Sequence, residues 1–84
     1  MRLTIYSKPD CHLCDDMKSI VRRAIAGRHD IQIEEVDISG NEDLLNRYGL
    51  EIPVLLIDGT KAAKYRIREG ALRRMLEARP GVTN

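Results

Sequence analysis

The sequence predicts an α/β fold with the element order β-α-β-α-β-β-α, and three observations support this prediction. First, four stretches with strand character recur along the chain, at residues 2–7, 31–37, 51–57 and 61–66. Second, segments with helical periodicity separate the first three of these stretches and follow the fourth. Third, the 84 residues contain no repeat, low-complexity segment or linker, which predicts one domain over 1–84 with its core at about 2–79.

The first strand leads into a helix that we expect from about Cys11 to Ala26. Its periodicity comes from apolar residues that are mostly three and four positions apart, namely Leu13, Met17, Ile20, Val21 and Ala24. Asp10 is a candidate N-cap because its carboxylate can accept a hydrogen bond from a free backbone N–H of the first turn. Gly27 follows the last turn, where glycine commonly ends a helix.

The middle of the chain predicts a second strand and a short helix. Residues 31–37 are rich in β-branched side chains. Ser39 and Glu42 then form a candidate capping box for a short helix, which Gly49 ends. Because a helix connects the first two strands, we expect them to lie parallel and to be joined by a right-handed crossover.

The next segment predicts a buried strand followed by a hairpin. The stretch 51–57 is the most apolar in the chain and carries Pro53 near its start, where a strand tolerates proline. Asp58-Gly59 is a turn signal that joins this strand to the fourth strand. In that strand we expect Ala63 and Tyr65 to lie on one face.

The last helix is expected from about Arg68 to Ala78, with Pro80-Gly81 ending it. Its expected apolar face consists of Ala71, Leu72, Met75 and Leu76. The net charge is +1, but residues 1–56 carry 7 basic and 10 acidic side chains, whereas residues 57–84 carry 7 basic and 3 acidic ones. No aromatic platform or recognition motif accompanies the basic end, so we expect a solvated surface and no nucleic-acid partner.

No targeting or membrane-spanning segment is expected. The N-terminus runs directly into the first strand, and no apolar run approaches the roughly 20 residues of a transmembrane helix. These features predict a cytoplasmic protein with no membrane partner, and a monomer is the default expectation. In a reducing cytosol, a lone Cys-x-x-Cys pair is more often reactive than a permanent cross-link.

The two cysteines of the chain, Cys11 and Cys14, stand at the junction of the first strand and the first helix. A helix N-terminus favours a thiolate and can lower a cysteine pKa from about 8.5 to roughly 3.5–7.5. Cys14 lies one turn further on, close enough to close a disulfide. Lys8 and His12 add positive charge near Cys11, whereas three nearby aspartates oppose the thiolate. The pattern predicts a dithiol redox site without a metal.

Two other interpretations of the cysteine pair remain open. The only other soft ligands are His12 and His29, so an intrachain zinc site would need an unusual geometry, and a metal or iron–sulfur centre would more simply bridge two chains. Alternatively, the chain is a binding module without turnover, because a fold by itself does not determine function. A thiolate–metal absorption band would favour the first alternative, and unreactive thiols would favour the second.

Residues 6–14 read Tyr-Ser-Lys-Pro-Asp-Cys-His-Leu-Cys and resemble the Tyr-Thr/Ser-Lys-x-x-Cys-x-x-Cys opening of the glutaredoxins and glutaredoxin-like redoxins. Ile52-Pro53 stands where that family has a hydrophobic residue followed by a cis-proline, and Asp58-Gly59 matches the turn after its third strand. With the order of elements, the resemblance covers nearly the whole chain. It implies the thioredoxin fold, in which three helices flank a four-stranded mixed sheet.

The resemblance also implies roles for individual residues. Cys11 would be the attacking thiolate and Cys14 the resolving thiol. Lys8 would lie beside the nucleophile and meet the carboxylate of a thiol substrate. Pro53 would be cis and face Cys11, which would leave the backbone of Ile52 free to pair with an extended substrate peptide.

The chain also departs from the family pattern. His12-Leu13 replaces the usual Pro-Tyr between the cysteines, and we expect both residues to contact substrate. The Gly-Gly pair and following Asp, which hold the γ-glutamyl end of glutathione in that family, have no match in residues 61–70. No cofactor is therefore expected, and glutathione is an optional thiol co-substrate. The predicted function is thiol–disulfide exchange with disulfide-containing proteins or small thiols, maintained by an unidentified thiol reductant.

Overall fold

The computed structural model describes residues 1–78 and contains one mixed sheet with the strand order β2-β1-β3-β4. β1 (Arg2–Ser7) lies parallel to β2 (Gln32–Asp37) on one side and antiparallel to β3 (Val54–Ile57) on the other. β4 (Thr60–Lys64) completes the sheet as the antiparallel partner of β3. The parallel pairing of the first two strands is therefore confirmed.

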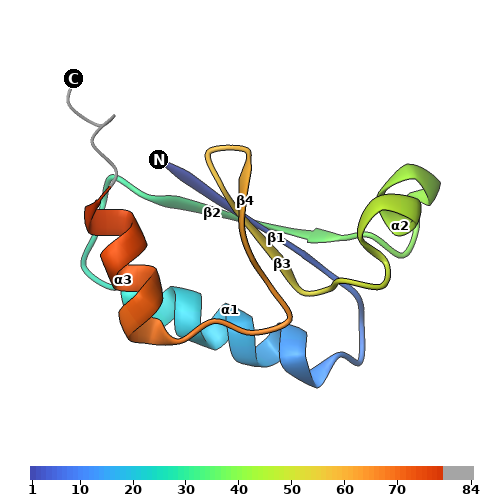
Figure 1. Ribbon diagram of the computed structural model, residues 1–84, viewed down its shortest axis with the longest axis horizontal. Helices are drawn as coiled ribbons and strands as arrows, with labels where there is room; N and C mark the ends of the chain where they lie inside the picture. Colours follow the sequence, from blue (N-terminus) through green and yellow to red (C-terminus); the bar gives the residue numbers. More distant parts are fainter. Residues whose placement is uncertain (79–84) are drawn as a thin grey trace.

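Three helices accompany the sheet, as predicted. They are α1 (His12–Ile25), α2 (Glu42–Tyr48) and α3 (Glu69–Glu77). Figure 1 shows α1 and α3 side by side on one face of the sheet, whereas α2 lies near the end of the sheet where β1 and β2 finish. None of the three helices in the described part of the chain combines the length and the apolar character needed to span a membrane.

The core lies between the sheet and the pair α1 and α3. The antiparallel register places Leu3 opposite Ile57 and Ile5 opposite Leu55, so these four side chains share one face of the sheet. All four are buried. The helices contribute the side chains that cover this face, namely Met17, Val21, Ala24, Leu72 and Leu76. Burial of this apolar surface is the main force that holds α1 against the sheet.

The start of α1 differs from the expectation. The N-cap is Cys11, not Asp10: Cys11 has extended backbone angles, and its sulfur accepts a hydrogen bond from the backbone N–H of Cys14 at 3.1 Å. Asp10 instead adopts a left-handed conformation with φ of 59°, which aspartate tolerates in turns. The other end agrees with the prediction, because Gly27 follows the helix with φ of 83°.

The start of α2 also differs. Asn41 is the N-cap, and its Oδ1 accepts a hydrogen bond from the backbone N–H of Leu44 at 3.0 Å. Ser39 does not form the expected capping box, because its hydroxyl donates to Asp37 Oδ1 at 2.6 Å, before the helix begins. Gly49 ends the helix as predicted, but with helical backbone angles.

The fourth strand is shorter than expected. It ends at Lys64, and Tyr65 turns away with a left-handed φ of 69°, so Ala63 and Tyr65 do not share a face of the strand. In α3, Leu72 and Leu76 are buried, whereas Met75 is 37% exposed and so lies outside the expected apolar face. The predicted stop at Pro80-Gly81 lies outside the described residues.

Candidate active site

Cys11 and Cys14 form a disulfide at the start of α1. Their Cα atoms are 5.2 Å apart, within the usual range of about 4.4–6.8 Å for bridged cysteines. The helix produces this proximity, because Cys11 caps it and Cys14 follows three residues later, close to one full turn. The predicted pairing of the two thiols is therefore present in the structure.

The two sulfurs have different surroundings. Cys14 is completely buried, whereas Cys11 is partly exposed at the helix start. An external disulfide can therefore approach Cys11 but not Cys14. The two sulfurs therefore differ in their accessibility to an external disulfide.

Backbone groups at the helix start favour negative charge on the Cys11 sulfur. The N–H of Cys14 donates to this sulfur at 3.1 Å. Hydrogen bonds to a thiolate stabilise it relative to the thiol, and the positive end of the helix macrodipole acts in the same direction. Asp15, in the first turn of the helix, adds an opposing negative charge.

The predicted binding residues Lys8, His12 and Leu13 surround the disulfide in sequence, with different exposures. Lys8 is half-buried in the segment between β1 and α1, and His12 is the exposed first residue of α1. Within residues 1–78, neither side chain has an ion-pair partner. Leu13, which lies between the two cysteines in the sequence, is half-buried and lines a surface hollow that neither cysteine lines.

The Ile52-Pro53 peptide bond is cis, as the family resemblance implies. Pro53 is buried and directly precedes β3, where Val54 lies opposite Tyr6. This register brings the start of β3 to the end of β1, from which the chain continues to Cys11. Within the described residues, the N–H and C=O of Ile52 have no hydrogen-bond partner. The backbone of Ile52 is therefore available for pairing with another chain.

Tyr65 supports this segment, and sequence reasoning missed it. Its backbone N–H donates to the Pro53 carbonyl at 2.8 Å, and its hydroxyl donates to the Leu50 carbonyl at 3.0 Å. Tyr65 thus holds the chain on both sides of Ile52. No local signal identifies this role, because Tyr65 follows a strand-like stretch and the sequence predicts that it continues the strand.

The hollow that Leu13 lines has a volume of about 740 Å³ and lies between α1 and the segment 65–68 that follows β4. Its α1 wall begins at Leu13, between the two cysteines, and ends at Arg23. No group of three or more His, Cys, Asp and Glu side chains within residues 1–78 is arranged to hold a metal ion.

Comparisons with known proteins agree with this description. A family model described as "Glutaredoxin-like domain (DUF836)" matches residues 2–77. The X-ray structure of the Northeast Structural Genomics target protein XcR50 from X. campestris is 34% identical, with a TM-score of 0.77 over 93% of this chain and 99% of that chain. The solution structure of protein Ne2328 from Nitrosomonas europaea is 25% identical, with a TM-score of 0.71 over 88% of each chain.

More distant structures share the fold. A thioredoxin from Halobacterium salinarum NRC-1 is 24% identical, with a TM-score of 0.62 over 92% of this chain and 72% of that chain. This likeness shows the fold alone, and no curated protein sequence matches the chain. The fold, the family match and the bridged Cys11–Cys14 pair together support a thiol–disulfide redox role. The chain belongs to the glutaredoxin-like family and has the thioredoxin fold.

Proposed function

We propose that this protein is a thiol–disulfide oxidoreductase in which Cys11 attacks and Cys14 resolves. The observation that carries the proposal is the asymmetry of the pair. Cys11 is partly exposed and receives a backbone N–H at the start of α1, whereas Cys14 is fully buried one turn later. An accessible sulfur beside a protected one is the arrangement that dithiol exchange uses.

The reaction proceeds in two exchange steps. The Cys11 thiolate attacks one sulfur of the substrate disulfide, which breaks the substrate S–S bond and releases a thiolate that takes up a proton. The Cys14 thiolate then attacks the Cys11 sulfur, which forms the Cys11–Cys14 disulfide and releases the second substrate thiolate. Two electrons pass from the protein dithiol to the substrate, and a thiol reductant, for which glutathione is one candidate, returns them.

Ile52 and Tyr65 supply a means of holding the substrate. The unpaired backbone of Ile52 offers one N–H and one C=O to an extended peptide, as an edge strand does. Tyr65 keeps this segment in place through its bonds to Leu50 and Pro53. We therefore propose disulfide-containing proteins or thiol peptides as the substrates, with Lys8, His12 and Leu13 nearest the reacting sulfurs.

The first test is an equilibrium titration of the protein in glutathione redox buffers, quenched with acid and analysed by intact mass. We expect a loss of two protons with a defined midpoint potential, in the span from about −270 mV for thioredoxin to about −200 mV for glutaredoxins. A stable glutathione adduct would instead identify glutathione as a bound partner. Thiols that stay reduced throughout would contradict the proposal and favour a binding module.

Two matched variants test the assigned roles. Cys11→Ser should abolish exchange, because the buried Cys14 cannot reach a substrate disulfide. Cys14→Ser should retain the first step and accumulate mixed disulfides, visible by mass spectrometry. Trapping by Cys11→Ser in place of Cys14→Ser would reverse the roles proposed for the two thiols, and full activity of Cys11→Ser would refute the mechanism.

A further inference from the structure

The hollow that Leu13 lines extends along α1 away from the turn that carries the two cysteines. Its α1 wall runs from Leu13 to Arg23, which at 1.5 Å per residue corresponds to about 15 Å. The opposite wall is the segment 65–68 between β4 and α3. An extended chain rises about 3.3 Å per residue, so four to five residues would span this length. We call this hollow the arginine groove.

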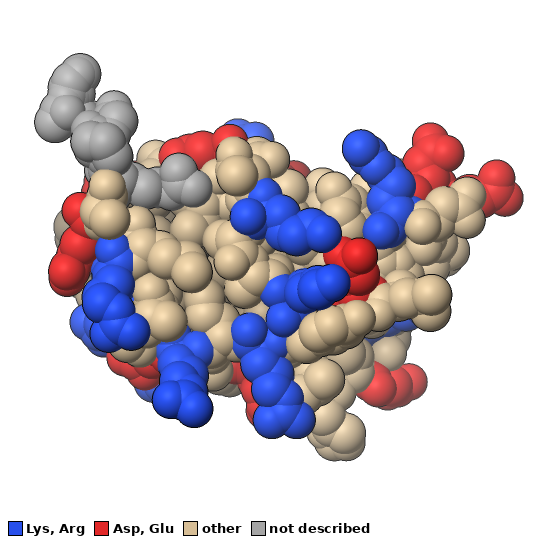
Figure 2. All heavy atoms as spheres, in the orientation of Figure 1, with Lys and Arg blue, Asp and Glu red and all other residues tan. Residues whose placement is uncertain are grey.

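The arginine groove combines apolar and cationic side chains. Ile20 and Ile67 are half-buried in its walls, and Met17 lies beneath them. Three arginines line it, Arg23, Arg66 and Arg68, against a single carboxylate, that of Asp16. Figure 2 shows Lys and Arg side chains spread across the face that β4, the following segment and α3 form. The groove therefore suits a ligand with carboxylates and apolar groups in alternation.

The charges of Arg66 and Arg68 are available to a ligand. Within residues 1–78, neither guanidinium has an ion-pair partner, whereas Arg23 is already bonded to Glu69. The backbone that carries the two free arginines is anchored. The N–H of Arg66 donates to the Lys64 carbonyl at 2.8 Å, and the Arg68 carbonyl accepts from Leu72 at 3.0 Å.

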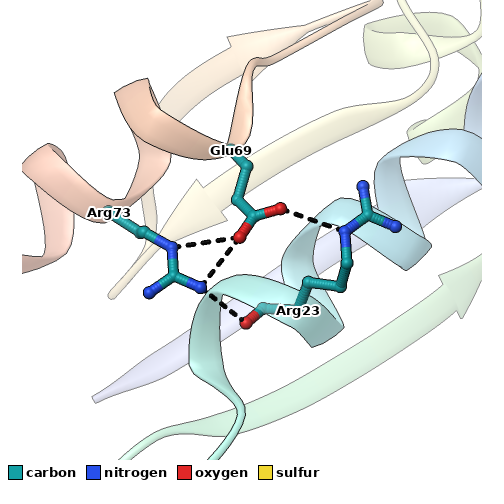
Figure 3. A network of polar contacts seen from close by, with 3 residues as sticks. All are labelled: Arg23, Glu69 and Arg73. Atoms are coloured by element: carbon teal, nitrogen blue, oxygen red, sulfur yellow. Dashed lines mark hydrogen bonds and ion pairs between the residues drawn. The ribbon is translucent and has the colours of Figure 1, made fainter.

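A network at the far end of the groove holds its two walls together (Figure 3). Glu69, the first residue of α3, accepts from Arg23 Nε of α1 at 3.0 Å and from Arg73 at 2.8 Å. Arg73 also donates to the Arg23 carbonyl at 3.2 Å. The start of α3 is thereby fixed to the end of α1, so the spacing between Arg68 and the α1 wall is set before a ligand arrives.

We infer that the arginine groove binds an extended acidic segment of a protein substrate that flanks the substrate disulfide. Carboxylates of this segment pair with Arg66 and Arg68, while its apolar side chains contact Ile20 and Ile67. The inference rests on the proposed function of the dithiol, and it adds the chemical class of the substrate. A nucleic acid fits the groove less well, because Asp16 and the isoleucines face it and no stacked aromatic platform accompanies the arginines.

Binding can be tested without any redox reaction. The probe is a fluorescent ten-residue peptide without cysteine, in which glutamate and leucine alternate, and the reference is the same peptide with glutamine for glutamate. We expect the oxidised protein to bind the acidic peptide and to bind it more weakly as salt is added. The glutamine peptide should bind about tenfold more weakly, since each exposed ion pair contributes up to about fivefold.

A charge-reversal pair locates the site. Arg66→Glu/Arg68→Glu should weaken acidic-peptide binding by about tenfold or more. The control Arg2→Glu/Arg74→Glu changes the net charge equally at two exposed positions outside the groove and should preserve binding. Arg66→Gln/Arg68→Gln should lie between the two, and far-ultraviolet circular dichroism establishes that each variant is folded. Equal binding by the two charge-reversal proteins would overturn the inference.

An exchange assay then connects the groove to catalysis. With disulfide-linked peptides, the acidic substrate should have a higher kcat/KM than its glutamine analogue, and the advantage should disappear in Arg66→Glu/Arg68→Glu through a higher KM. If no disulfide is exchanged, the proposed dithiol function is refuted. The peptide-binding result does not depend on exchange and would still hold. If the acidic peptide does not bind, or if only a single-stranded oligonucleotide displaces it, the inference that the arginine groove binds an acidic protein segment is refuted.

Discussion

The two faces of the sheet are covered in different ways. Leu3 and Ile5 of β1 point towards α1 and α3, where the covering helices have fully buried side chains. Tyr6 points to the opposite face and stacks on Tyr48 of α2, with ring centroids 4.7 Å apart. Within α2 no residue is fully buried. One face is therefore covered by two helices over a continuous apolar core, whereas the other carries the buried side chains of Val54 and Leu56 and contacts α2 through an aromatic pair.

The functional groups follow this division. The disulfide and the arginine groove both belong to the well-packed face, because α1 carries the two sulfurs and one wall of the groove. The buried Cys14 is in turn part of the packed face of α1. The comparison suggests that the α1–α3 side holds the reacting groups in place and that α2 contributes less to stability.

The largest contrast is expected from core truncations on the two faces. Leu72→Ala removes a fully buried side chain beneath α3 and should lower the free energy of unfolding by about 2–5 kcal/mol. Leu45→Ala removes a half-buried side chain from α2 and should cost about 1 kcal/mol. Urea unfolding followed by circular dichroism measures both. Equal losses would show that α2 is packed as firmly as α3.

A smaller effect is expected at the start of α2. Asn41→Ala removes the side chain that accepts the N–H of Leu44 and should cost about 1 kcal/mol of unfolding free energy. Ser39→Ala is the matched control, because its hydroxyl bonds to Asp37 outside the helix, and it should change stability by about 0.5 kcal/mol or less. A larger loss of unfolding free energy for Ser39→Ala than for Asn41→Ala would indicate that Ser39 caps α2, as the sequence predicts.

The N-caps of α1 and α2 show which features the sequence predicts and which it does not. The order of elements follows from periodicity, and the dithiol follows from two cysteines at a strand–helix junction. The cap residues do not follow, because Asp10 and Cys11, or Ser39 and Asn41, are adjacent candidates with similar capping ability. Only the backbone angles of the two adjacent candidates show which one is the cap, and these angles depend on the path of the chain after the preceding strand.

The remaining features depend on contacts between distant segments. Arg23 and Glu69 are 46 positions apart, and Tyr65 reaches Leu50 across 15 positions. The hydrophobic periodicity of the sequence does not predict contacts between segments so far apart in the chain. The sequence also predicts that Tyr65 continues the fourth strand, whereas its left-handed φ ends the strand at Lys64. The arginine groove has the same origin, because β4 must return to α1 before Arg66 and Leu13 can line one hollow.

The smallest expected effect is a pH dependence of the contact between α1 and α3. Hydrogen bonds from Arg23 and then Arg73 hold the pKa of Glu69 below its ordinary value in the folded protein. Because the folded pKa is the lower one, the stabilisation is fully present above about pH 4.5 and disappears as the pH falls through the lowered pKa. The carboxylate is partly exposed, with 32% of the side chain accessible, so solvent screening keeps the effect small.

Glu69→Gln isolates this contribution, because glutamine cannot carry the charge that both arginines contact. Urea unfolding of wild type and Glu69→Gln between pH 7 and pH 3 should show a stability difference that favours wild type at neutral pH and vanishes at the acidic end. The control Glu34→Gln removes an exposed carboxylate on β2 that has no ion pair within residues 1–78. A wild-type advantage that grew on acidification would mean that Glu69 is protonated more easily in the folded protein, opposite to the direction that its arginine contacts require.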